Sequence, residues 1–496
     1  MSTKREPTLL ESFVPVIFLI LVLVINVGIF GSNALDGSNQ IVLILSAGVA
    51  TLVALRLGFK WDEIQQGIVK SISSAMVSML ILLLIGALAG TWMLSGVVPT
   101  MIYYGLQILN PTIFLVAACI VCAVVSIATG SSWTTSATVG IALMGIGQAL
   151  KIPVGLVGGA ILSGAYFGDK MSPLSDTTNL APAMAGTDLF THIRYMTITT
   201  VPSISLALLI FMFIGLFNTG SGNITETEAI LNAIDAKFYI SGWLFIVPIV
   251  VVVLIVKKMP AMPAILIGSL LGSVFALIFQ PSLVKEVALT VSRDGGLYEL
   301  FGGDSSGFSQ SFMGIMQAMF GDIYFETGIE SLDSEGLLSA SGMQGMLGTI
   351  WLILSAMIFG GVMERAGMLK RIAQSIISFV NSTGSLISST VGTCLFFNLT
   401  ASDQYLAIVV PGRMYADTYR EKGLAPENLS RALEDSGTVT SVLIPWNTCG
   451  AYHATVLKVD TFTFAPYCFF NIISPIMTII IGYAGYKIKK LATKSE

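Results

Sequence analysis

The sequence GDKMSPLSDTTNLAPA, residues 168–183, places two aspartates, a lysine and five Ser, Thr or Asn side chains inside an otherwise apolar chain. Gly168 and Pro173 interrupt a helix, and the hydroxyl and amide side chains can satisfy the backbone groups that an interruption leaves unpaired. Asp169 and Asp176 add negative charge. Hard cations bind oxygen ligands of this kind, with one or two carboxylates among them. The stretch therefore predicts a broken helix that binds a cation.

The composition around this stretch is that of an integral membrane protein. Of the 496 residues, 54% are hydrophobic and 11% are charged, whereas a soluble domain has about 25% charged residues. Residues 71–150 contain no Asp, Glu, Lys or Arg, and about 20 apolar residues suffice to cross a bilayer. We expect an all-α polytopic membrane protein with the lipid bilayer as its partner. We expect no enzyme, no cofactor and no nucleic-acid partner.

The distribution of charge predicts the topology. Lys and Arg cluster near the N-terminus and in residues 487–496, whereas residues 281–345 carry nine acidic residues against two basic ones. Because positive charge is retained on the cytoplasmic side, both termini are expected in the cytoplasm and the 281–345 segment outside. The apolar N-terminal segment lacks the small-residue cleavage site of a signal peptide, which favours a retained first helix in a multi-pass protein of the plasma membrane.

Three motifs recur at one constant spacing. LAGTWMLSG (88–96) resembles IFGGVMERAG (358–367), IATGSSW (127–133) resembles NLTASDQ (398–404), and PLSDTTNLA (173–181) resembles IPWNTCGAY (444–452). An offset of 271 residues pairs Gly96 with Gly367, Thr129 with Thr400 and Asp176 with Asn447. A single gapless offset across polar as well as glycine positions favours a duplication over chance similarity of apolar sequence.

The duplication divides the chain into five parts. These are an N-terminal cytoplasmic end with the first helix (1–40), a first repeat (41–217), a linking helix and loops (218–261), a second repeat with the acidic extracytoplasmic insertion (262–486), and a basic cytoplasmic tail (487–496).

Two repeats with broken helices are typical of secondary transporters, which bind their substrate at the repeat interface near the middle of the membrane. The chain contains no GxxxxGK[ST] motif for ATP hydrolysis, so the energy is expected to come from an ion gradient. A cation channel lined by hydroxyl groups is an alternative. The duplication and the broken helices favour a carrier.

A second pair of polar segments, ATGSSWTTS (128–136) and FNLTASDQY (397–405), places Asp403 opposite Ser132. A charge at the bilayer centre costs at least about 2.5–3.5 kcal/mol on insertion scales, so an Asp there indicates function. Its alternative is a hydrated position at the interface. A desolvated carboxylate takes up a proton, and a cation bound by the same oxygens expels it, which couples the two ions in exchange.

Other polar residues are open to ordinary interpretations. Asp188 and His192 follow the first motif, and we interpret them as part of a cytoplasmic loop. Glu364 lies beside Arg365, with which it can form a surface ion pair.

The motif GDKMSPLSDTTNLAPA, together with SSWTTSATVGIAL (131–143) and FAPYCFFNIISP (464–475), resembles the NhaC family of bacterial Na⁺/H⁺ antiporters over nearly the full length. The resemblance implies the fold of the ion transporter superfamily, with two inverted repeats, re-entrant hairpins and a transport domain that moves against a dimeric scaffold. It implies exchange of Na⁺ for H⁺ across the bacterial inner membrane by alternating access, with ion sites at the hairpin tips and helix breaks.

The ion-binding residues expected in the first repeat are Thr129, Ser131, Ser132, Asp169, Asp176, Thr177, Thr178 and Asn179, and those in the second are Thr400, Ser402, Asp403, Asn447 and Thr448. Among them, Asp176, Asp403 and Asn447 are expected to bind the Na⁺ ion. The family also contains members that exchange malate for lactate and others linked to amino acids. The alternative function is thus a Na⁺- or H⁺-coupled carrier of a small organic anion or amino acid, for which Arg413 and Arg431 are candidate partners.

Overall fold

The computed structural model describes residues 4–30, 37–108, 110–217, 224–291, 307–327, 333, 338–377 and 380–491. The first half of the described chain is helical throughout. Its α-helices are α1 (Leu9–Phe30), α2 (Ser38–Arg56), α3 (Trp61–Leu94), α4 (Val97–Ile108), α5 (Pro111–Thr129), α6 (Ser132–Thr135), α7 (Ile141–Ala149), α8 (Val154–Met171), α9 (Asp176–Ala185), α10 (Leu189–Phe217), α11 (Ile224–Lys237) and α12 (Ile246–Val256), with the π-helix η2 (Ser136–Gly140) and the 3₁₀ helix η3 (Gly242–Phe245) between them.

The second half begins with α13 (Ala261–Phe279), α14 (Pro281–Leu289) and α15 (Gly307–Phe320), followed by the short strands β1 (Ile323–Tyr324) and β2 (Ser339–Ala340). The strands pair antiparallel, with Ile323 opposite Ala340. The remaining elements are η6 (Gln344–Met346), α17 (Leu347–Arg365), α18 (Met368–Ile377), α19 (Thr383–Thr400), α20 (Gln404–Glu421), α21 (Pro426–Leu433), the π-helix η7 (Glu434–Thr438), η8 (Ser441–Leu443), α22 (Thr448–Leu457), α23 (Thr461–Phe464), η9 (Ala465–Tyr467) and α24 (Phe469–Ala484).

Many of these helices are long and apolar enough to cross a membrane. Within the described residues seven helices meet this criterion, and the number rises to nine if each of two bent helix pairs forms one span. The seven are α1, α2, α3, α5, α10, α13 and η6 together with α17. The bent pairs are α11 with η3 and α12, and α23 with η9 and α24. The protein is therefore a multi-pass membrane protein, as the composition predicts.

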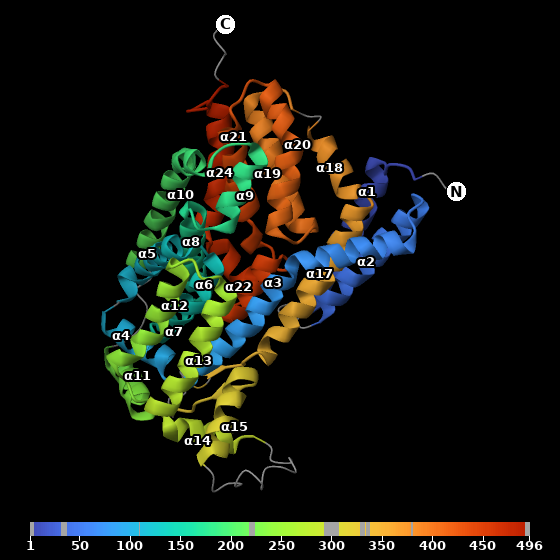
Figure 1. Cartoon of the computed structure of the whole chain (residues 1–496). Coiled ribbons are helices and arrows are strands. Elements are labelled where there is room, and N and C mark those ends of the chain that lie inside the picture. Colours follow the sequence, from blue (N-terminus) through green and yellow to red (C-terminus); the bar gives the residue numbers. More distant parts are fainter. Residues whose placement is uncertain are drawn as a thin grey trace.

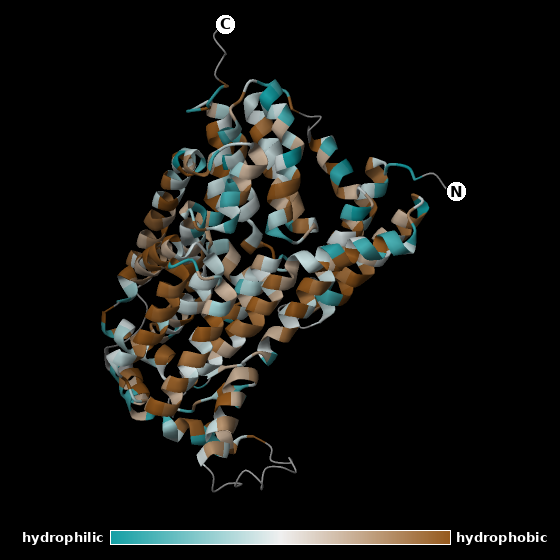
Figure 2. Cartoon of the chain, in the orientation of Figure 1, coloured by the Kyte–Doolittle hydropathy of each residue, from teal (hydrophilic) through white to brown (hydrophobic). Residues whose placement is uncertain are grey.

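The helices form two groups (Figure 1). Helices α2, α3 and α17 pack side by side as a slanted layer, with α13 and α15 also packed against α3. A second group is built around α5 packed on α8, and around α24 packed on both α10 and α19. Helices α9 and α20 join the second group through their mutual contact. Apolar residues dominate the slanted layer and the outer helices, whereas hydrophilic residues gather near both ends of the chain (Figure 2).

The 271-residue offset recurs in the boundaries of the helices. Helices α3 and α17 end at Leu94 and Arg365, and α5 and α19 end at Thr129 and Thr400. Helix α4 begins at Val97, and α18 begins 271 residues later at Met368. The fold class expected from the sequence, an all-α polytopic membrane protein with two related halves and broken helices, is confirmed.

Helices α5 and α8 pack at backbone distance because small residues line their contact. A Cβ atom at Gly164 would lie 2.0 Å from the carbonyl oxygen of Cys119, and one at Gly168 would lie 2.5 Å from that of Ala123. Since real Cβ atoms do not approach a carbonyl so closely, the contact requires glycine at both positions. This packing fixes the end of α8, where Asp169 follows Gly168.

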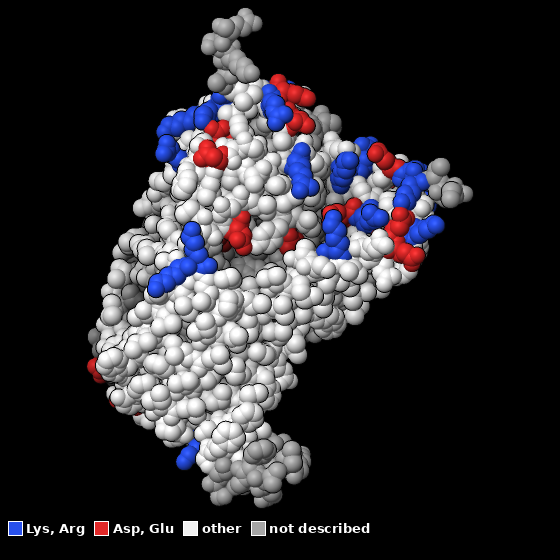
Figure 3. All heavy atoms as spheres, in the orientation of Figure 1, with Lys and Arg blue, Asp and Glu red and all other residues white. Residues whose placement is uncertain are grey.

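The C-terminal segment is held against the turn before α21. Backbone hydrogen bonds run from Ala425 N to Lys489 O, 3.0 Å, and from Leu491 N to Gly423 O, 2.9 Å. The side chain of Lys489 also forms an ion pair with Glu427. In the space-filling view, Lys and Arg side chains gather on the upper end, which carries both termini, and the lower part of this face is nearly uncharged (Figure 3).

Several sequence-based expectations fall partly outside the described residues. These are the acidic insertion, of which residues 292–306, 328–332 and 334–337 are not described, and the basic tail, of which residues 492–496 are not described. The described part of the insertion contains α14, α15 and the two strands.

Candidate ion-binding site

The first helix break separates α5 from α6. Gly130 ends α5 in the left-handed conformation, with φ of 72°, and its contact with Leu174 leaves no room for a side chain. The next residue, Ser131, caps α6 by accepting a hydrogen bond from the backbone N–H of Thr134, 3.2 Å. The hydroxyl of Thr129 lies 3.5 Å from that of Thr135. This break is therefore lined by hydroxyl groups, as the sequence predicts.

Asp169 is a buried carboxylate at this break. Its Oδ2 accepts hydrogen bonds from both the backbone N–H, 3.0 Å, and the hydroxyl, 2.6 Å, of Ser132. The side chain is 7% exposed. Two donors to one oxygen favour the charged form of a carboxylate that burial would otherwise disfavour. Asp169 and Ser132 thus join the end of α8 to the start of α6.

The second break, residues 172–175, separates α8 from α9, and the predicted residues around it point in different directions. Asp176 is the first residue of α9 and is exposed, and Asn179 is also exposed. Thr177 is buried and donates to Glu434 Oε1, 3.1 Å. Thr178 donates to the carbonyl oxygens of Asp169, 3.1 Å, and Lys170, 3.0 Å. Thr178 therefore satisfies carbonyl groups that the break in the helix leaves free.

The equivalent break in the second half separates α19 from α20. Thr400 ends α19 and donates to the carbonyl oxygen of Phe396, 2.7 Å. Ser402 has a positive φ of 59°, and its buried hydroxyl has no hydrogen-bond partner among the described residues. Asp403 is 3% exposed and caps α20 by accepting from Leu406 N, 3.0 Å. Asp403 is therefore buried at the helix break rather than hydrated at a surface.

The fourth break lies between η8 and α22, where Asn447 caps α22. Its Oδ1 accepts from the backbone N–H of Cys449, 3.0 Å, and its Nδ2 donates to the carbonyl oxygen of Asn398, 3.1 Å. The backbone N–H of Thr448 donates to Ser402 O, 3.0 Å. These contacts bring Asn447, Thr448 and Ser402 together, although they lie in separate motifs of the sequence.

The two halves meet at these breaks. Trp133 stacks on Tyr452 with ring centroids 3.8 Å apart, and the Tyr452 hydroxyl donates to the carbonyl oxygen of Trp133, 2.8 Å. Tyr405 lies within electrostatic range of Asp176, Asp403 and Asp169. The carboxylates predicted from three different motifs therefore surround one tyrosine.

Three buried charged residues were not expected from the sequence. Lys170 and Asp435 form an ion pair in which neither side chain is exposed. Glu434 precedes Asp435 in η7, and both are fully buried. A signal for this group exists in the sequence, where two acids and Arg431 stand within five residues of an apolar segment. Their partners lie more than 250 residues away, so spacing alone does not reveal the group.

Other expectations are corrected by the structure. His192 is not part of a loop: it lies buried in α10, and its Nδ1 is 2.8 Å from the hydroxyl of Ser430. Arg365 pairs with Glu63, 3.7 Å, rather than with its neighbour Glu364.

The two candidate arginines differ in their surroundings. Arg413 is exposed. Arg431 is fully buried, with its guanidinium 4.6 Å from the ring centroid of Tyr195, and its nitrogens have no hydrogen-bond partner among the described residues.

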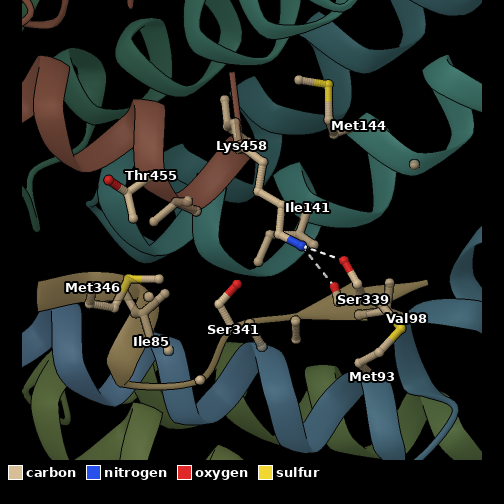
Figure 4. Close-up of a pocket in the computed structure, with 18 of the residues that line it drawn as sticks. Ile85, Met93, Val98, Ile141, Met144, Ser339, Ser341, Met346, Thr455 and Lys458 are labelled. Atoms are coloured by element: carbon tan, nitrogen blue, oxygen red, sulfur yellow. Dashed lines mark hydrogen bonds between the residues drawn. The ribbon is translucent and has the colours of Figure 1, made fainter. Parts of the chain in front are cut away.

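A cavity of about 340 Å³ lies between α3, α4, α7, α22 and the turn that contains β2 (Figure 4). Among the described residues that line it, Lys458 is the only charged one. Its Nζ donates to the carbonyl oxygen, 2.9 Å, and to the hydroxyl, 3.0 Å, of Ser339. The lining also includes the polar side chains of Gln148, Ser341 and Thr455. None of the residues predicted to bind ions lines this cavity.

Comparisons with known proteins agree with these features. Residues 164–486 match the Na⁺/H⁺ antiporter family. The chain is 36% identical over 451 residues to the Na⁺/H⁺ antiporter NhaC of Alkalihalophilus pseudofirmus, covering 91% of each chain. It is 36% identical over 486 residues to the malate-2H⁺/Na⁺-lactate antiporter of Bacillus subtilis, covering 98% of this chain and 96% of the other.

A third relative is the arginine/ornithine antiporter ArcD of Halobacterium salinarum, which is 32% identical over 98% of this chain and 93% of the other. The family match spans more than half of the chain and includes the second, third and fourth breaks. The chain therefore belongs to the Na⁺/H⁺ antiporter family.

Proposed function

We propose that this protein exchanges Na⁺ for H⁺ across the bacterial inner membrane by alternating access. The observation that carries the proposal is the buried carboxylate of Asp169, held by Ser132 at a point where two broken helices meet. Broken helices expose carbonyl groups and polar side chains inside the membrane, which is the usual construction of a cation site in secondary transporters. Membership of the Na⁺/H⁺ antiporter family supports the same function.

The proposed Na⁺ ligands are Asp176, Asp403 and Asn447, with the surrounding hydroxyl groups as further oxygen donors. Asp176 is exposed at the start of α9, where an ion can reach it, whereas Asp403 and Asn447 are buried at the second-half breaks. Tyr405 lies within electrostatic range of both aspartates. In this arrangement a cation and a proton compete for the same carboxylates, so that binding of one releases the other.

The orientation follows from charge. Basic side chains gather on the end that carries both termini (Figure 3), and retention of positive charge places that end in the cytoplasm. The resemblance to the ion transporter superfamily implies a homodimer in which the scaffold groups of two copies meet. Crosslinking in native membranes tests the dimer.

Proteoliposomes with a trapped pH-sensitive dye test the exchange itself. Na⁺ added outside is expected to raise the internal pH, because each entering cation is exchanged for departing protons. Protein-free liposomes and addition of K⁺ are the controls for leakage and for cation selectivity. An unchanged internal pH after addition of Na⁺ would contradict the proposal.

A second candidate function is the coupled transport of a small organic anion, and the cavity at Lys458 favours it. An ammonium group has three donors, and Lys458 uses two of them on Ser339. The third can bind a carboxylate in a cavity of suitable size for a small dicarboxylate. One relative is a malate-2H⁺/Na⁺-lactate antiporter, which carries such anions.

Uptake of radiolabelled malate, lactate and arginine into the same proteoliposomes tests this second function. Lys458→Met is expected to raise the KM for a transported organic anion at least tenfold, whereas Lys422→Met, at the exposed end of α20, leaves it unchanged. Absence of uptake by the unmodified protein would exclude this function for the anions tested.

A further inference from the structure

Glu434 has an unsatisfied oxygen in the interior of the protein. Its side chain is fully buried in η7. Oε1 accepts a hydrogen bond from Thr177, 3.1 Å, but Oε2 has no partner among the described residues. Burial of a carboxylate oxygen without a donor is costly. The position therefore requires something else to bind this oxygen.

Further oxygen atoms surround the Glu434 carboxylate. The hydroxyl of Thr438 lies beside it, is fully buried, and has no hydrogen-bond partner of its own by geometry. On the other side, the hydroxyl of Ser175 lies 3.1 Å from that of Thr177 and also contacts Asp169. Asp169 in turn interacts electrostatically with Glu434. Two carboxylates and three hydroxyls from α8, α9, the break between them and η7 thus converge in one place.

The charges of this group are not balanced. Lys170 is the cation that acts on Glu434 electrostatically, but its Nζ already pairs with Asp435 and donates to Ser474, 3.1 Å. Three buried carboxylates, Asp169, Glu434 and Asp435, therefore share one ammonium group. One monovalent cation bound between Asp169 and Glu434 would reduce this excess of negative charge.

We propose that Glu434 is a ligand of a second Na⁺ site, which lies between the two halves of the chain and is separate from Asp403 and Asn447. The ligands are the side-chain oxygens of Asp169, Ser175, Thr177, Glu434 and Thr438. The first half supplies the broken helix and the second half supplies the π-helix, so a relative movement of the halves opens or closes the site. This inference rests on the proposed transport of Na⁺ and adds a residue to its binding site.

Equilibrium binding of ²²Na⁺ to the purified full-length protein at fixed pH tests the site without transport. Glu434→Gln is expected to weaken Na⁺ binding at least tenfold, and Glu434→Asp to recover part of the affinity. Glu427→Gln is the matched control, because Glu427 lies on the adjoining α21 and pairs with Lys489 instead. Unchanged Na⁺ affinity in Glu434→Gln would overturn the proposal.

If Glu434→Gln does not fold, Thr438→Val decides the question, because it removes one ligand oxygen and keeps every charge. A severalfold loss of Na⁺ affinity supports the site, and an unchanged affinity overturns it. Proton movement in proteoliposomes separates this inference from the proposed function. Glu434-dependent Na⁺ binding in a protein that moves no protons supports the site and contradicts exchange, whereas normal exchange with unaltered binding in Glu434→Gln contradicts the site alone.

Discussion

Lys170 of α8 and Asp435 of η7 form an ion pair with no solvent exposure on either side chain. The two residues lie 265 positions apart and in different halves of the chain. Ser474 and Thr478 of α24 supply further hydrogen bonds to the pair. Three elements are therefore held together by one satisfied network in the interior.

Removal of one member of this pair is expected to destabilise the protein strongly. In Lys170→Met, the Asp435 carboxylate remains buried without its cation, which costs about 3–5 kcal/mol in comparable cases. The double variant Lys170→Met/Asp435→Leu is expected to regain most of the loss, because no unpaired charge remains. Thermal unfolding of the purified variants measures both effects. A single variant as stable as the unmodified protein would show that water or another group reaches the pair.

Asp176→Asn is expected to abolish Na⁺-driven proton movement while the protein stays folded. Asp176 is exposed at the first position of α9, where loss of its charge removes only about 0.3–1 kcal/mol of helix stabilisation. Asp188→Asn is the matched control, since Asp188 is also exposed and binds the backbone N–H of Thr191 near the start of α10. Asn serves as a cap equally well. Exchange at the normal rate and with an unchanged pH profile in Asp176→Asn would remove this residue from the site.

The two halves are expected to have opposite orientations in the membrane. Lys151 follows α7, and Lys422 lies 271 residues later at the end of α20. In Figure 1 α7 lies in the lower part of the molecule and α20 in the upper part. Cysteines introduced at these positions are expected to differ in their reaction with an impermeant thiol reagent in intact cells. The five natural cysteines are free and buried, so they give little background. Equal labelling at both positions would contradict the inversion.

Asp403→Asn is expected to reduce the number of protons moved per Na⁺ ion. Two carboxylates near one cavity titrate as a coupled pair, and exchange of more than one proton per Na⁺ is electrogenic. The amide of Asn can still accept the hydrogen bond from Leu406 N that Asp403 accepts, so the helix cap survives the substitution. Transport in proteoliposomes under an imposed potential measures the effect. Rates independent of potential in the unmodified protein would contradict a mechanism with two carboxylates.

The breaks in the helices could be predicted from the sequence, because their causes are local. Gly130 requires a positive φ, and Ser131, Ser175, Asp403 and Asn447 each cap the helix that follows. Such residues have the same effect wherever they stand in an apolar segment. The constant offset then transferred each prediction from one half to the other.

The surroundings of the charged residues could not be predicted in the same way. His192 resembles a loop residue in the sequence, but α21 brings Ser430 against it from 238 positions away. Glu434 likewise has its partner Thr177 in the other half. Burial of these side chains depends on how distant helices pack, and a single sequence contains no measure of that packing.

The hydrogen bond between Ser132 and Asp169 also bears on how the two halves diverged. Counted at the same offset, Ser132 corresponds to Asp403, and Asp169 corresponds to Thr440, which binds Asn398. The acid and the hydroxyl have therefore exchanged positions between the halves. Copies that were identical after duplication could keep one carboxylate each while its location moved to the opposite helix. Selection on such a pair acts on the total charge of each half, which leaves the individual positions free to change together.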